Sequence, residues 1–463
     1  MPGTRIQISF DHGTLVLSHL SHEQALNFSW LVYDERNRTY RTAARNYREL
    51  VLFLHEEGIS YDDQAKNFLP LSLPLASDIS PFPHQADALE AWVNAGKRGI
   101  VELPTGAGKT ILAVLAIAKV QRPTLVVVPT IDLLIQWQKV LQTHFAQEIG
   151  MVGGGSHDRK PITVTTYDSA SFNTEFWGNE FGFLICDECH HLPAPAYEFI
   201  AAGAIAPFRL GLTATLERPD GKESICEDLL GSQCFSLPID ALEGKYLAPY
   251  EVRRIPVELT VDERNRYEDS RKTYLSFLRK SHVSFNQPNG WAQFIMLCQR
   301  SAEGKKALRA YREQRKIAFS SAGKTDALWK VLLEHKHDRI IVFTEDNETV
   351  YQLSHLLFFP VITHHTKVAE RKKLLQAFSD GDLPILLTSK VLNEGVDVPD
   401  ANIGIVLSGS GSVREHVQRL GRILRKRPGK QAILYEIFSG SSAESGVSER
   451  RRQHRAYMGR DEC

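Results

Sequence analysis

The sequence contains little cysteine, no excess of either charge and no long hydrophobic run. Six cysteines in 463 residues are too few for a disulfide-stabilised scaffold, so we expect the protein to work in a reducing cytoplasm. No apolar stretch is long enough to span a membrane, and the first residues lack the pattern of a signal peptide. Lys plus Arg and Asp plus Glu both total 55, so a surface for nucleic acid has to be local.

Two of the cysteines stand close together, which raises the question of a metal site. Cys186 and Cys189 are followed directly by two histidines, and these are residue types that bind zinc. Cys186 ends an apolar strand, so the two thiols would not point in one direction, and no second ligand pair follows at zinc-finger spacing. We therefore reject a zinc site here.

The segment LPTGAGKT, residues 103–110, has the composition of a phosphate-binding loop. It lies between a strand-like run and a stretch of strong helix formers. Gly106 and Gly108 allow backbone N–H groups to turn toward phosphate oxygens. Lys109 offers a positive charge to the β- and γ-phosphates, and Thr110 offers a hydroxyl to Mg²⁺.

One position of this loop departs from the strict pattern, which has glycine five places before Gly108. Leu103 stands there, and an ordinary glycine-rich loop is the alternative interpretation. The Gly-Lys-Thr string between a strand and a helix favours the phosphate-binding loop. We expect contacts with ATP from the whole turn: Thr105, Gly106, Ala107, Gly108, Lys109 and Thr110.

Patterns of strands and helices divide the chain into five parts, and the fold class is α/β. Residues 1–78 predict a small α+β domain, and residues 79–260 predict an α/β domain whose parallel sheet is buried on both faces. Residues 261–324 have helical periodicity, residues 325–440 predict a second α/β domain, and residues 441–463 predict a basic tail. Because only the first α/β domain has a phosphate loop, we expect the second to complete one ATP site.

Short apolar runs predict the strands of the two parallel sheets. In the first sheet they lie at 124–128, 162–165, 181–186 and 209–212, and in the second at 340–343, 361–363, 385–388, 403–407 and 432–437. In the N-terminal domain, alternation over residues 5–17 predicts two strands around a turn, and further strands are expected at 28–32 and 39–42.

The N-terminal domain also contains a group of five arginines. For any single one of them we favour a solvated surface, whereas as a group they could contact phosphate. The five residues are Arg36, Arg38, Arg41, Arg45 and Arg48.

The segment 261–324 is basic in an otherwise neutral protein, with 14 Lys plus Arg against 6 Asp plus Glu. Aromatic residues are interleaved, and most of them are expected in the core of a helical insertion: Tyr267, Tyr274, Phe277, Phe285, Trp291 and Phe294. The excess of positive charge indicates a grip on nucleic acid. Arg271 and Lys272 are candidates for this contact.

Asp187 and Glu188 follow an apolar strand of the first α/β domain. An aspartate at a strand end can hold Mg²⁺ through water, and the neighbouring carboxylate can orient or deprotonate an attacking water. Further along, GLTAT at 211–215 places two hydroxyls after a strand, where they can link the ATP site to a polynucleotide groove.

Near the C-terminus, QRLGRILR places Arg422 and Arg425 one helical turn apart, after Gln418. Two guanidinium groups on one helix face can neutralise the charge that develops on the γ-phosphate. A solvated basic helix is the alternative interpretation.

These strings, in this order and spacing, resemble the motor of superfamily 2 helicases, and most closely the XPB family of DNA helicases. The resemblance covers nearly the whole chain and implies two RecA-like domains, a damage-recognition domain at the N-terminus and a DNA-gripping thumb at 261–324. It also implies ATP-driven 3′→5′ movement on DNA, with Mg²⁺ as cofactor, in DNA repair or transcription.

The resemblance assigns roles to particular residues. Lys109 and Thr110 would hold phosphate and Mg²⁺, Asp187 the Mg²⁺ and Glu188 the water, while Gln418, Arg422 and Arg425 would complete catalysis. Nucleotide contacts are implied for Gln85, Glu394 and Asp397. Contacts with DNA are implied for Pro129, Thr130, Thr166, Arg218, Asp220 and Thr388.

Two departures from the family pattern affect these expectations. Phe82 stands where the family has an arginine before the adenine-reading Gln85, so adenine recognition is expected to be looser. The Arg-Glu-Asp triplet implied in strand separation is Arg218-Pro219-Asp220 here, and proline removes the central carboxylate. The sequence therefore supports the expectation of ATP hydrolysis more strongly than the expectation of strand separation.

The alternatives are a translocase on double-stranded DNA that never separates strands, an RNA helicase, and an architectural DNA-binding subunit that uses ATP only to set its shape. We expect a monomer in isolation without membrane association. A nuclease is the expected partner, because archaeal relatives pair with one.

Overall fold

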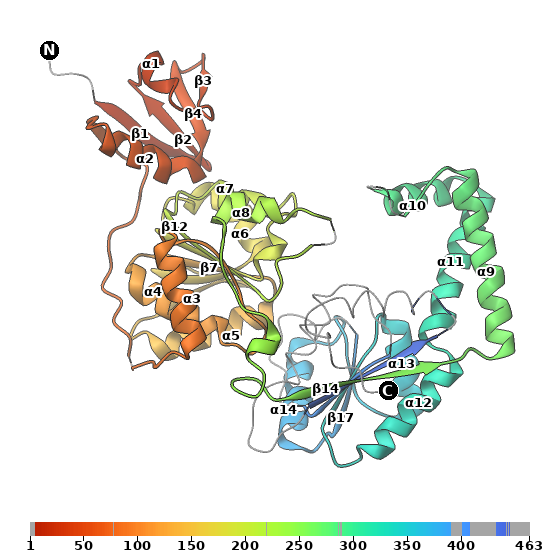
Figure 1. Cartoon of the computed structure of the whole chain (residues 1–463). Helices are drawn as coiled ribbons and strands as arrows, with labels where there is room; N and C mark the ends of the chain where they lie inside the picture. Colours follow the sequence, from red (N-terminus) through yellow and green to blue (C-terminus); the bar gives the residue numbers. More distant parts are fainter. Residues whose placement is uncertain are drawn as a thin grey trace. The chain divides into compact units, whose positions relative to one another are not determined.

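The computed structural model describes residues 5–76, 78–218, 220–285, 287, 289–389, 401–407, 432–440, 442 and 444. The chain forms two compact units, the first built mainly from residues up to Ala241 and the second from Leu242 onward. Figure 1 labels the helices and strands of both units.

The first unit begins with the predicted small α+β domain. Its five-stranded sheet has the order β3-β4-β2-β1-β5, with α2 packed on one face. The elements are β1 Ile6–Asp11, β2 Thr14–Ser18, α1 His22–Ala25, β3 Val32–Asp34, β4 Thr39–Ala43, α2 Tyr47–Glu56 and β5 Tyr61–Asp63. The expected turn between β1 and β2 is confirmed, and both His12 and Gly13 adopt positive φ there.

The strand predicted at residues 28–32 is wrong for most of its length, because β3 begins only at Val32. The N–H of Phe28 donates to the Ala25 carbonyl in a turn at the end of α1. The Phe28 ring is buried against Trp30 and Phe53, with centroids 4.6 and 4.7 Å away. Its hydrophobicity therefore serves the core of the domain and not a strand face.

Two of the clustered arginines dock this domain on the α/β domain of the same unit. Arg48 Nη1 donates to the carbonyl oxygens of Gly96 at 2.7 Å and Pro207 at 3.1 Å, and burial lowers the pKa of its guanidinium. Arg45 forms an ion pair with Asp228. A solvated surface, which we favoured for single arginines, is therefore wrong for these two.

The other arginines of the cluster differ in their surroundings. Arg36 is 85% exposed and paired with Asp34, as expected of a solvated residue. Arg41 is partly buried and donates to Asp11 at 2.7 Å.

The α/β domain of the first unit has an eight-stranded sheet in the order β13-β6-β12-β11-β7-β10-β8-β9. All pairs are parallel except β8 with β9. The strands are β6 Arg98–Glu102, β7 Thr124–Val128, β8 Ile149–Gly153, β9 Ser156–Asp158, β10 Ile162–Thr166, β11 Phe183–Asp187, β12 Phe208–Thr213 and β13 Gln233–Ser236. The helices are α3 Pro83–Asn94, α4 Lys109–Val120, α5 Ile131–His144, α6 Tyr167–Trp177, α7 Glu198–Ala202 and α8 Glu223–Leu230.

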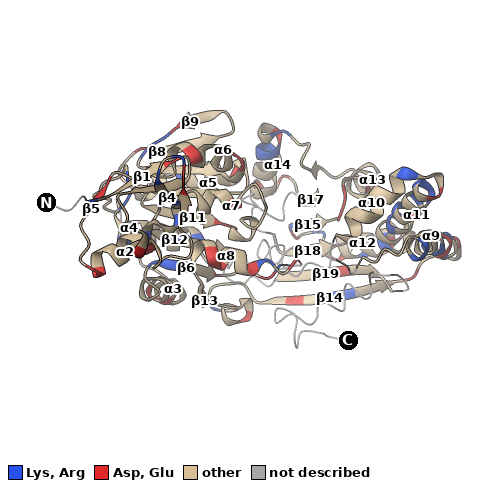
Figure 2. Cartoon of the chain, turned by 90° about the horizontal axis from the view of Figure 1, so that it is seen from above, with Lys and Arg blue, Asp and Glu red and all other residues tan. Residues whose placement is uncertain are grey.

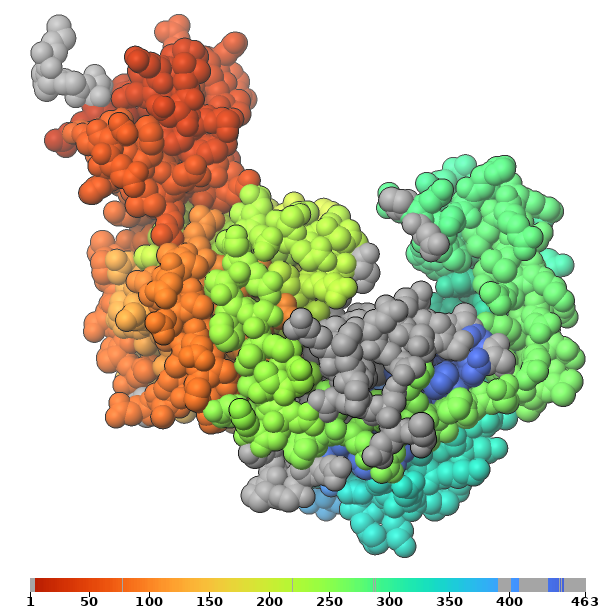
Figure 3. Space-filling view, viewed as in Figure 1, coloured from red at the N-terminus to blue at the C-terminus, as the bar shows by residue number. Residues whose placement is uncertain are grey.

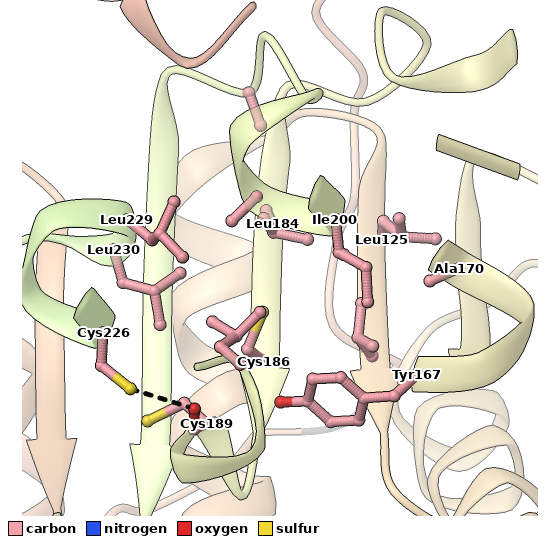
Figure 4. Packing of buried hydrophobic residues seen from close by; sticks show 14 of the residues in the cluster. Leu125, Tyr167, Ala170, Leu184, Cys186, Cys189, Ile200, Cys226, Leu229 and Leu230 are labelled. Carbon is pink, nitrogen blue, oxygen red and sulfur yellow. Dashed lines mark hydrogen bonds between the residues drawn. The ribbon is translucent and has the colours of Figure 1, made fainter. Parts of the chain in front are cut away.

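The central strands of this sheet are buried along their whole length, as the apolar runs predicted. Every residue of β7, β10 and β11 is buried. The thiols of Cys186, Cys189 and Cys226 lie in one apolar cluster with leucines from β11 and α8 (Figure 4). Burial raises the pKa of the Cys186 thiol, so these cysteines are part of the core.

The second unit contains a six-stranded, all-parallel sheet in the order β14-β19-β18-β15-β17-β16. Its strands are β14 Tyr250–Val257, β15 Ile340–Phe343, β16 Val361–Ile362, β17 Ile385–Thr388, β18 Ile403–Val406 and β19 Ala432–Ser439, which confirms the five predicted runs. Helices α12 Ala322–Glu334, α13 Asn347–Leu357 and α14 Val368–Asp380 belong to the same unit.

Strand β14 corrects the expected boundary of the first α/β domain. All eight residues of β14 pair in parallel with β19, from Tyr250 with Ala432 to Val257 with Ser439. Residues 250–257 therefore belong to the second sheet and not to a first domain that ends at residue 260.

The basic segment is helical, as predicted, and projects from the second sheet domain. It consists of α9 Val261–Lys280, α10 Gly290–Arg300 and α11 Ala302–Phe319, coloured green in Figure 3. Tyr274, Phe277 and Phe294 are buried in its core, which confirms the expectation for most of the aromatics. Phe285 and Trp291 remain 39% and 46% exposed beside them.

Among the helices that the structure describes, none combines the length and the apolar character needed to cross a membrane.

Candidate nucleotide site and nucleic-acid surface

The phosphate loop has the backbone that its glycines predicted. Gly106 and Gly108 have φ of 88° and 84°, a conformation that favours glycine, and Gly108 caps the start of α4. Lys109 Nζ donates to the Leu103 carbonyl at 3.2 Å and lies 3.9 Å from Glu188 Oε1. The loop therefore presents the first N–H groups of a helix and one ammonium group at the same place, which suits an anion.

Leu103 explains why this loop tolerates a residue other than glycine at its start. The Leu103 side chain is fully buried, and the Leu103 backbone N–H donates to the Thr213 carbonyl at 2.9 Å. The position thus continues β6 beside β12 before the turn begins, in a backbone conformation that needs no glycine.

Asp187 and Glu188 lie at the carboxyl end of β11, as predicted, and Asp187 is held by three hydrogen bonds. Its Oδ1 accepts from the Glu188 N–H at 3.0 Å, and its Oδ2 accepts from Trp137 Nε1 at 2.8 Å. Its carbonyl oxygen accepts from the Tyr167 hydroxyl at 3.0 Å. The carboxylate is therefore oriented by the adjacent Glu188 N–H and by Trp137, 50 residues away in the sequence, while Tyr167 holds the main chain.

Burial raises the pKa of Asp187 to about 6, and the adjacent Glu188 charge acts in the same direction. Lys109 and the Trp137 hydrogen bond act against this rise. Glu188 adopts a left-handed backbone with φ of 48°, which is uncommon outside glycine and places its carboxylate toward Lys109. Such strain is typical of functional positions.

The Thr213 hydroxyl takes part in polar contacts at the GLTAT string, and the expected link from an ATP site to a polynucleotide groove stays a prediction. Its hydroxyl lies 3.1 Å from His190 Nδ1 and donates to the Thr215 carbonyl at 2.8 Å. His190 Nδ1 also lies 3.5 Å from Glu188 Oε2. A continuous set of polar contacts therefore connects Glu188 to the end of β12.

Gln85 lies against the phosphate loop and is 2% exposed. Its Nε2 donates to the carbonyls of Ala107 at 3.1 Å and Gly108 at 3.3 Å, while its Oε1 accepts from the Phe82 N–H at 2.9 Å. The side chain therefore supports the loop in this structure, and its role in reading adenine stays a prediction. The ring of Phe82, at the position where the family has arginine, is 52% exposed.

The residues at this site fit a magnesium–nucleotide complex. Thr105 Oγ1 and Glu188 Oε2 are buried and, among the described residues, have no hydrogen-bond partner. Buried polar atoms of this kind are usually satisfied, so their position beside the loop indicates an external ligand. In the described part of the chain no three His, Cys, Asp or Glu side chains converge on one point. Mg²⁺ in nucleotide sites needs only one or two carboxylates besides phosphate and water.

Thr130 and Thr166 begin α5 and α6 at neighbouring strands of the sheet. The Thr130 hydroxyl accepts from the Leu133 N–H at 3.3 Å, and the Thr166 hydroxyl accepts from the Ser169 N–H at 3.2 Å. Because Thr166 pairs with Val128 of β7, both helix starts lie at one edge of the sheet. Pro129 and Thr130 are half-buried and Thr166 is buried, so a backbone contact with a polynucleotide fits these positions better than a side-chain contact.

Arg218 and Asp220 are engaged with each other. Arg218 Nε and Nη2 donate to the two Asp220 oxygens at 2.8 and 2.7 Å, and Arg218 Nη1 donates to the His190 carbonyl. This ion pair lowers the pKa of Asp220 to about 2. Pro219 lies outside the described residues. In this structure the Arg218 guanidinium is therefore hydrogen-bonded within the protein, to Asp220 and to His190, which follows the Asp187-Glu188 pair by two residues.

In the second unit, Thr388 is fully buried and its hydroxyl donates to the Ile362 carbonyl at 3.1 Å. Its side chain is therefore inaccessible to DNA. Arg271 and Lys272 are exposed on α9, in the region where Figure 2 shows Lys and Arg segments along α9 and α11.

The remaining predicted site residues lie outside the described residues: Glu394, Asp397, Gln418, Arg422 and Arg425. Sequence reasoning missed two residues that touch Asp187, namely Trp137 and Tyr167. No local pattern indicated that these two residues would converge on one aspartate.

Comparison with known families divides the chain into three matches. Residues 8–65 match the XPB helicase damage-recognition domain, residues 78–218 match the restriction-subunit family of type III restriction enzymes, and residues 323–427 match the conserved C-terminal helicase domain. The matches agree with the small N-terminal domain and the two parallel-sheet domains.

Two relatives and one solved structure are similar over most of the chain. The DNA 3′-5′ translocase XPB2 of Sulfurisphaera tokodaii is 39% identical, over 91% of this chain and 96% of its own length. The DNA 3′-5′ helicase XPB of Mycobacterium tuberculosis is 31% identical over 79% of this chain, which spans only 62% of that protein. The crystal structure of the Pyrococcus furiosus Hef helicase domain covers 79% of this chain at 18% identity, with a TM-score of 0.52, and supports the fold alone.

Proposed function

This chain belongs to the XPB family of DNA 3′→5′ helicases and translocases, and we propose that it hydrolyses ATP to move 3′→5′ along DNA. The single observation that supports this best is the meeting of Lys109 and Glu188 at the phosphate loop, 3.9 Å apart and beside the buried Thr105 hydroxyl, which has no hydrogen-bond partner among the described residues. DNA repair is the proposed setting, with transcription as the other.

In this proposal the residues of the first unit position ATP and water. The turn around Gly106 and Gly108 binds the phosphates through backbone N–H groups, and Lys109 neutralises their charge. Glu188, turned toward the same place by its left-handed backbone, accepts a proton from the attacking water or orients it. Thr110 and Asp187 would hold Mg²⁺, which supplies charge stabilisation to the phosphates when bound.

The remaining steps involve residues outside the described part of the chain. Arg422 and Arg425 are proposed to neutralise the γ-phosphate charge, with Gln418 beside them, and Glu394 and Asp397 are proposed to contact the nucleotide. This division of labour between two domains makes hydrolysis depend on both, which is how ATP turnover can drive stepwise movement.

Replacing the loop lysine tests the assignment directly. We expect Lys109→Ala to lower the ATPase rate with single-stranded DNA at least about 100-fold, because the phosphate charge loses the ammonium group that lies at the loop. Lys119→Ala, at the other end of the same helix, serves as the matched control and should retain the wild-type rate. Full activity of Lys109→Ala in a multiple-turnover assay would sink the proposal.

One specific observation favours a second candidate function, a translocase on duplex DNA that does not separate strands. Pro219 replaces the central carboxylate of the triplet implied in strand separation, and Arg218 is held by Asp220 and by the His190 carbonyl. Both candidates use the same ATP chemistry and differ only in what movement does to the duplex.

For the remaining expectations we propose a protein that is monomeric in isolation, works in the cytoplasm on DNA in preference to RNA, and acts beside a nuclease. A preference for RNA would show as stronger stimulation of the ATPase by RNA than by DNA of equal length.

A further inference from the structure

Asp187 receives a hydrogen bond from each of two helices that begin at the proposed DNA-facing edge of the sheet. Trp137 of α5 donates to its side chain, and Tyr167 of α6 donates to its main chain. Both aromatic residues are 1% exposed, and both helices follow strands that neighbour each other in the sheet. The site residue is thus tied to two elements and not to its own strand alone.

Trp137 connects Asp187 to the start of α5. It stands seven residues after Thr130, two helical turns along one rigid element. The Trp137 side chain is 1% exposed, so its indole N–H cannot bond to solvent, and loss of its partner would leave a buried donor unpaired. A shift of α5 should therefore move the Asp187 carboxylate as well, because breaking the Trp137–Asp187 hydrogen bond would leave the buried indole N–H unpaired.

Tyr167 makes the corresponding connection for α6. It is the first residue of that helix and follows Thr166 directly, so a contact at Thr166 acts on the adjacent backbone. Figure 4 shows its ring directed across the core toward Cys186 and Cys189, the residues that flank the Asp-Glu pair. The hydroxyl holds the Asp187 carbonyl oxygen and with it the direction in which the chain leaves β11.

We propose that Trp137 and Tyr167 are positioning residues that couple polynucleotide binding at the starts of α5 and α6 to the placement of Asp187. Nucleic acid that orders the two helix starts fixes both donors, and the donors fix the aspartate for the magnesium–nucleotide complex. This inference rests on the proposed function, since it needs both DNA at Thr130 and Thr166 and a metal at Asp187.

A purely structural explanation is the alternative, in which both hydrogen bonds only satisfy buried polar atoms. The same domain offers a matched control for it. Trp92 of α3 is also 1% exposed and donates Nε1 to the Arg209 carbonyl at 2.9 Å, near the amino end of β12. Trp92→Phe and Trp137→Phe remove the same donor from equally buried sites, but only Trp137 touches Asp187.

The first experiment uses the full-length Trp137→Phe variant. We expect the ratio of ATPase rates with and without single-stranded DNA to fall about five- to tenfold, the net effect of losing one typical intramolecular hydrogen bond. The Mg²⁺ concentration for half-maximal activity should rise by a similar factor, because the carboxylate is no longer held in one orientation.

A second readout needs no turnover. Fluorescence anisotropy of a mant-labelled ATP analogue, titrated with Mg²⁺ in the absence of DNA, should show the same several-fold loss of Mg²⁺-dependent affinity in Trp137→Phe. Binding of the nucleotide without Mg²⁺ should stay at the wild-type level. The control Trp92→Phe should leave both quantities unchanged even if its melting temperature falls.

Tyr167→Phe tests the second connection with a smaller change, because only one hydroxyl oxygen is lost. We expect its DNA stimulation to fall about two- to fivefold. Tyr47→Phe, which removes the hydroxyl that donates to Asp63 in the N-terminal domain at 2.6 Å, should behave like the wild type.

The outcomes separate the inference from the function on which it rests. If wild-type protein shows no ATPase or no stimulation by DNA, the proposed function fails. If the wild type is stimulated and Trp137→Phe keeps both that stimulation and its Mg²⁺ dependence, the coupling is overturned. Equal losses in Trp92→Phe and Trp137→Phe would also overturn it, because they would reduce the effect to general destabilisation.

Discussion

Asp187 is a carboxylate in a place that disfavours its charge. It is 6% exposed, and the nearest cation, Lys109, interacts with it less strongly than burial and Glu188 do. In the absence of Mg²⁺ and nucleotide, the site therefore has more negative charge than it can stabilise. Carboxylates with a raised pKa are common at functional sites, and this cost is in keeping with the proposed Mg²⁺ site.

The raised pKa of Asp187 gives a pH-dependent prediction at the residue scale. Between about pH 4, the ordinary value, and about pH 6, the folded chain binds a proton that the unfolded chain releases. The contribution of Asp187 to the free energy of unfolding therefore falls as the pH rises through this window and remains lost above it. Asp187→Asn removes this loss.

In EDTA we expect Asp187→Asn to melt near the wild-type temperature at pH 4 and above it at pH 7. At pH 7 its free energy of unfolding should exceed that of the wild type by on the order of 2 kcal/mol. Differential scanning fluorimetry across this range measures the difference. Asp34→Asn is the control, because Arg36 lowers the pKa of Asp34 and so reverses the sign of its pH dependence. A constant difference between pH 4 and pH 7 would contradict the prediction.

Most of the candidate site could be predicted from sequence where the signal is local. For the turn 103–110 and for the Asp187-Glu188 pair, a pattern of a few residues beside a strand end is enough to indicate the function. Trp137 could not be found in this way, because its partner Asp187 is 50 residues away and nothing in the indole's own neighbourhood specifies it. The burial of the Thr388 side chain inside β17 likewise became visible only with the neighbouring strand in place, and a backbone contact of DNA at Thr388 stays a prediction.

At the scale of elements, the positively charged residues of helix α9 fall into two groups, those paired with glutamates and those without an ion pair among the described residues. Arg266 and Lys280 of α9 form ion pairs with Glu313 and Glu303. Arg271 and Lys272 lie on the same helix, are exposed and form no ion pair with another described residue. The charge excess of this segment is therefore concentrated on a subset of its cations, which are available for phosphate.

This difference predicts the salt dependence of DNA binding. For Arg271→Gln with Lys272→Gln, we expect the slope of log affinity against log salt concentration to decrease by about 1 to 2, since each phosphate contact releases about one counterion. Fluorescence anisotropy with a labelled duplex measures this slope between low and moderate salt.

The matched control for that experiment is Arg266→Gln with Lys280→Gln, which removes the same charge from residues already paired with glutamates. Its slope should change by less than half as much, and ATP hydrolysis without DNA should be unchanged in both double variants. Equal slopes in the wild type and in both variants would show that these cations form only a solvated surface.

The elements also show where local patterns fail to define a sheet. The runs at 124–128 and 340–343 are apolar except for Thr124 and were predicted to the residue, because strands buried on both faces need no particular partner to be recognised. Strand β14 contains Arg253, Arg254 and Pro256, and no such run is visible. It is a strand because β19 pairs with all eight of its residues, 182 positions later in the chain.

At the scale of the whole molecule, the open question is what ATP-driven movement does to a duplex. The Arg218–Asp220 ion pair and Pro219 favour movement without strand separation. We expect the wild type to displace a triplex-forming strand from duplex DNA in an ATP-dependent way, with at least about tenfold less activity on a forked duplex of equal length.

The variant Pro219→Glu restores the acidic residue of the family triplet and tests this interpretation. Its unwinding of a fluorescent forked duplex should rise several-fold, while its ATPase rate changes less than about twofold. Wild-type protein that unwinds forks as fast as it displaces a third strand would favour the helicase instead.

The docking of the N-terminal domain has a consequence for how the protein is made. The core of that domain comes from residues before 66, apart from Ile205, whereas the groups that Arg48 and Arg45 bind extend to Asp228, 180 positions after Arg48. At about 5–20 residues per second, ribosomes need roughly 10–40 s to add this stretch. The docking surface is therefore completed well after the residues of the domain have been made, and a nascent chain arrested before Pro207 lacks both the second acceptor of Arg48 and the Asp228 partner of Arg45.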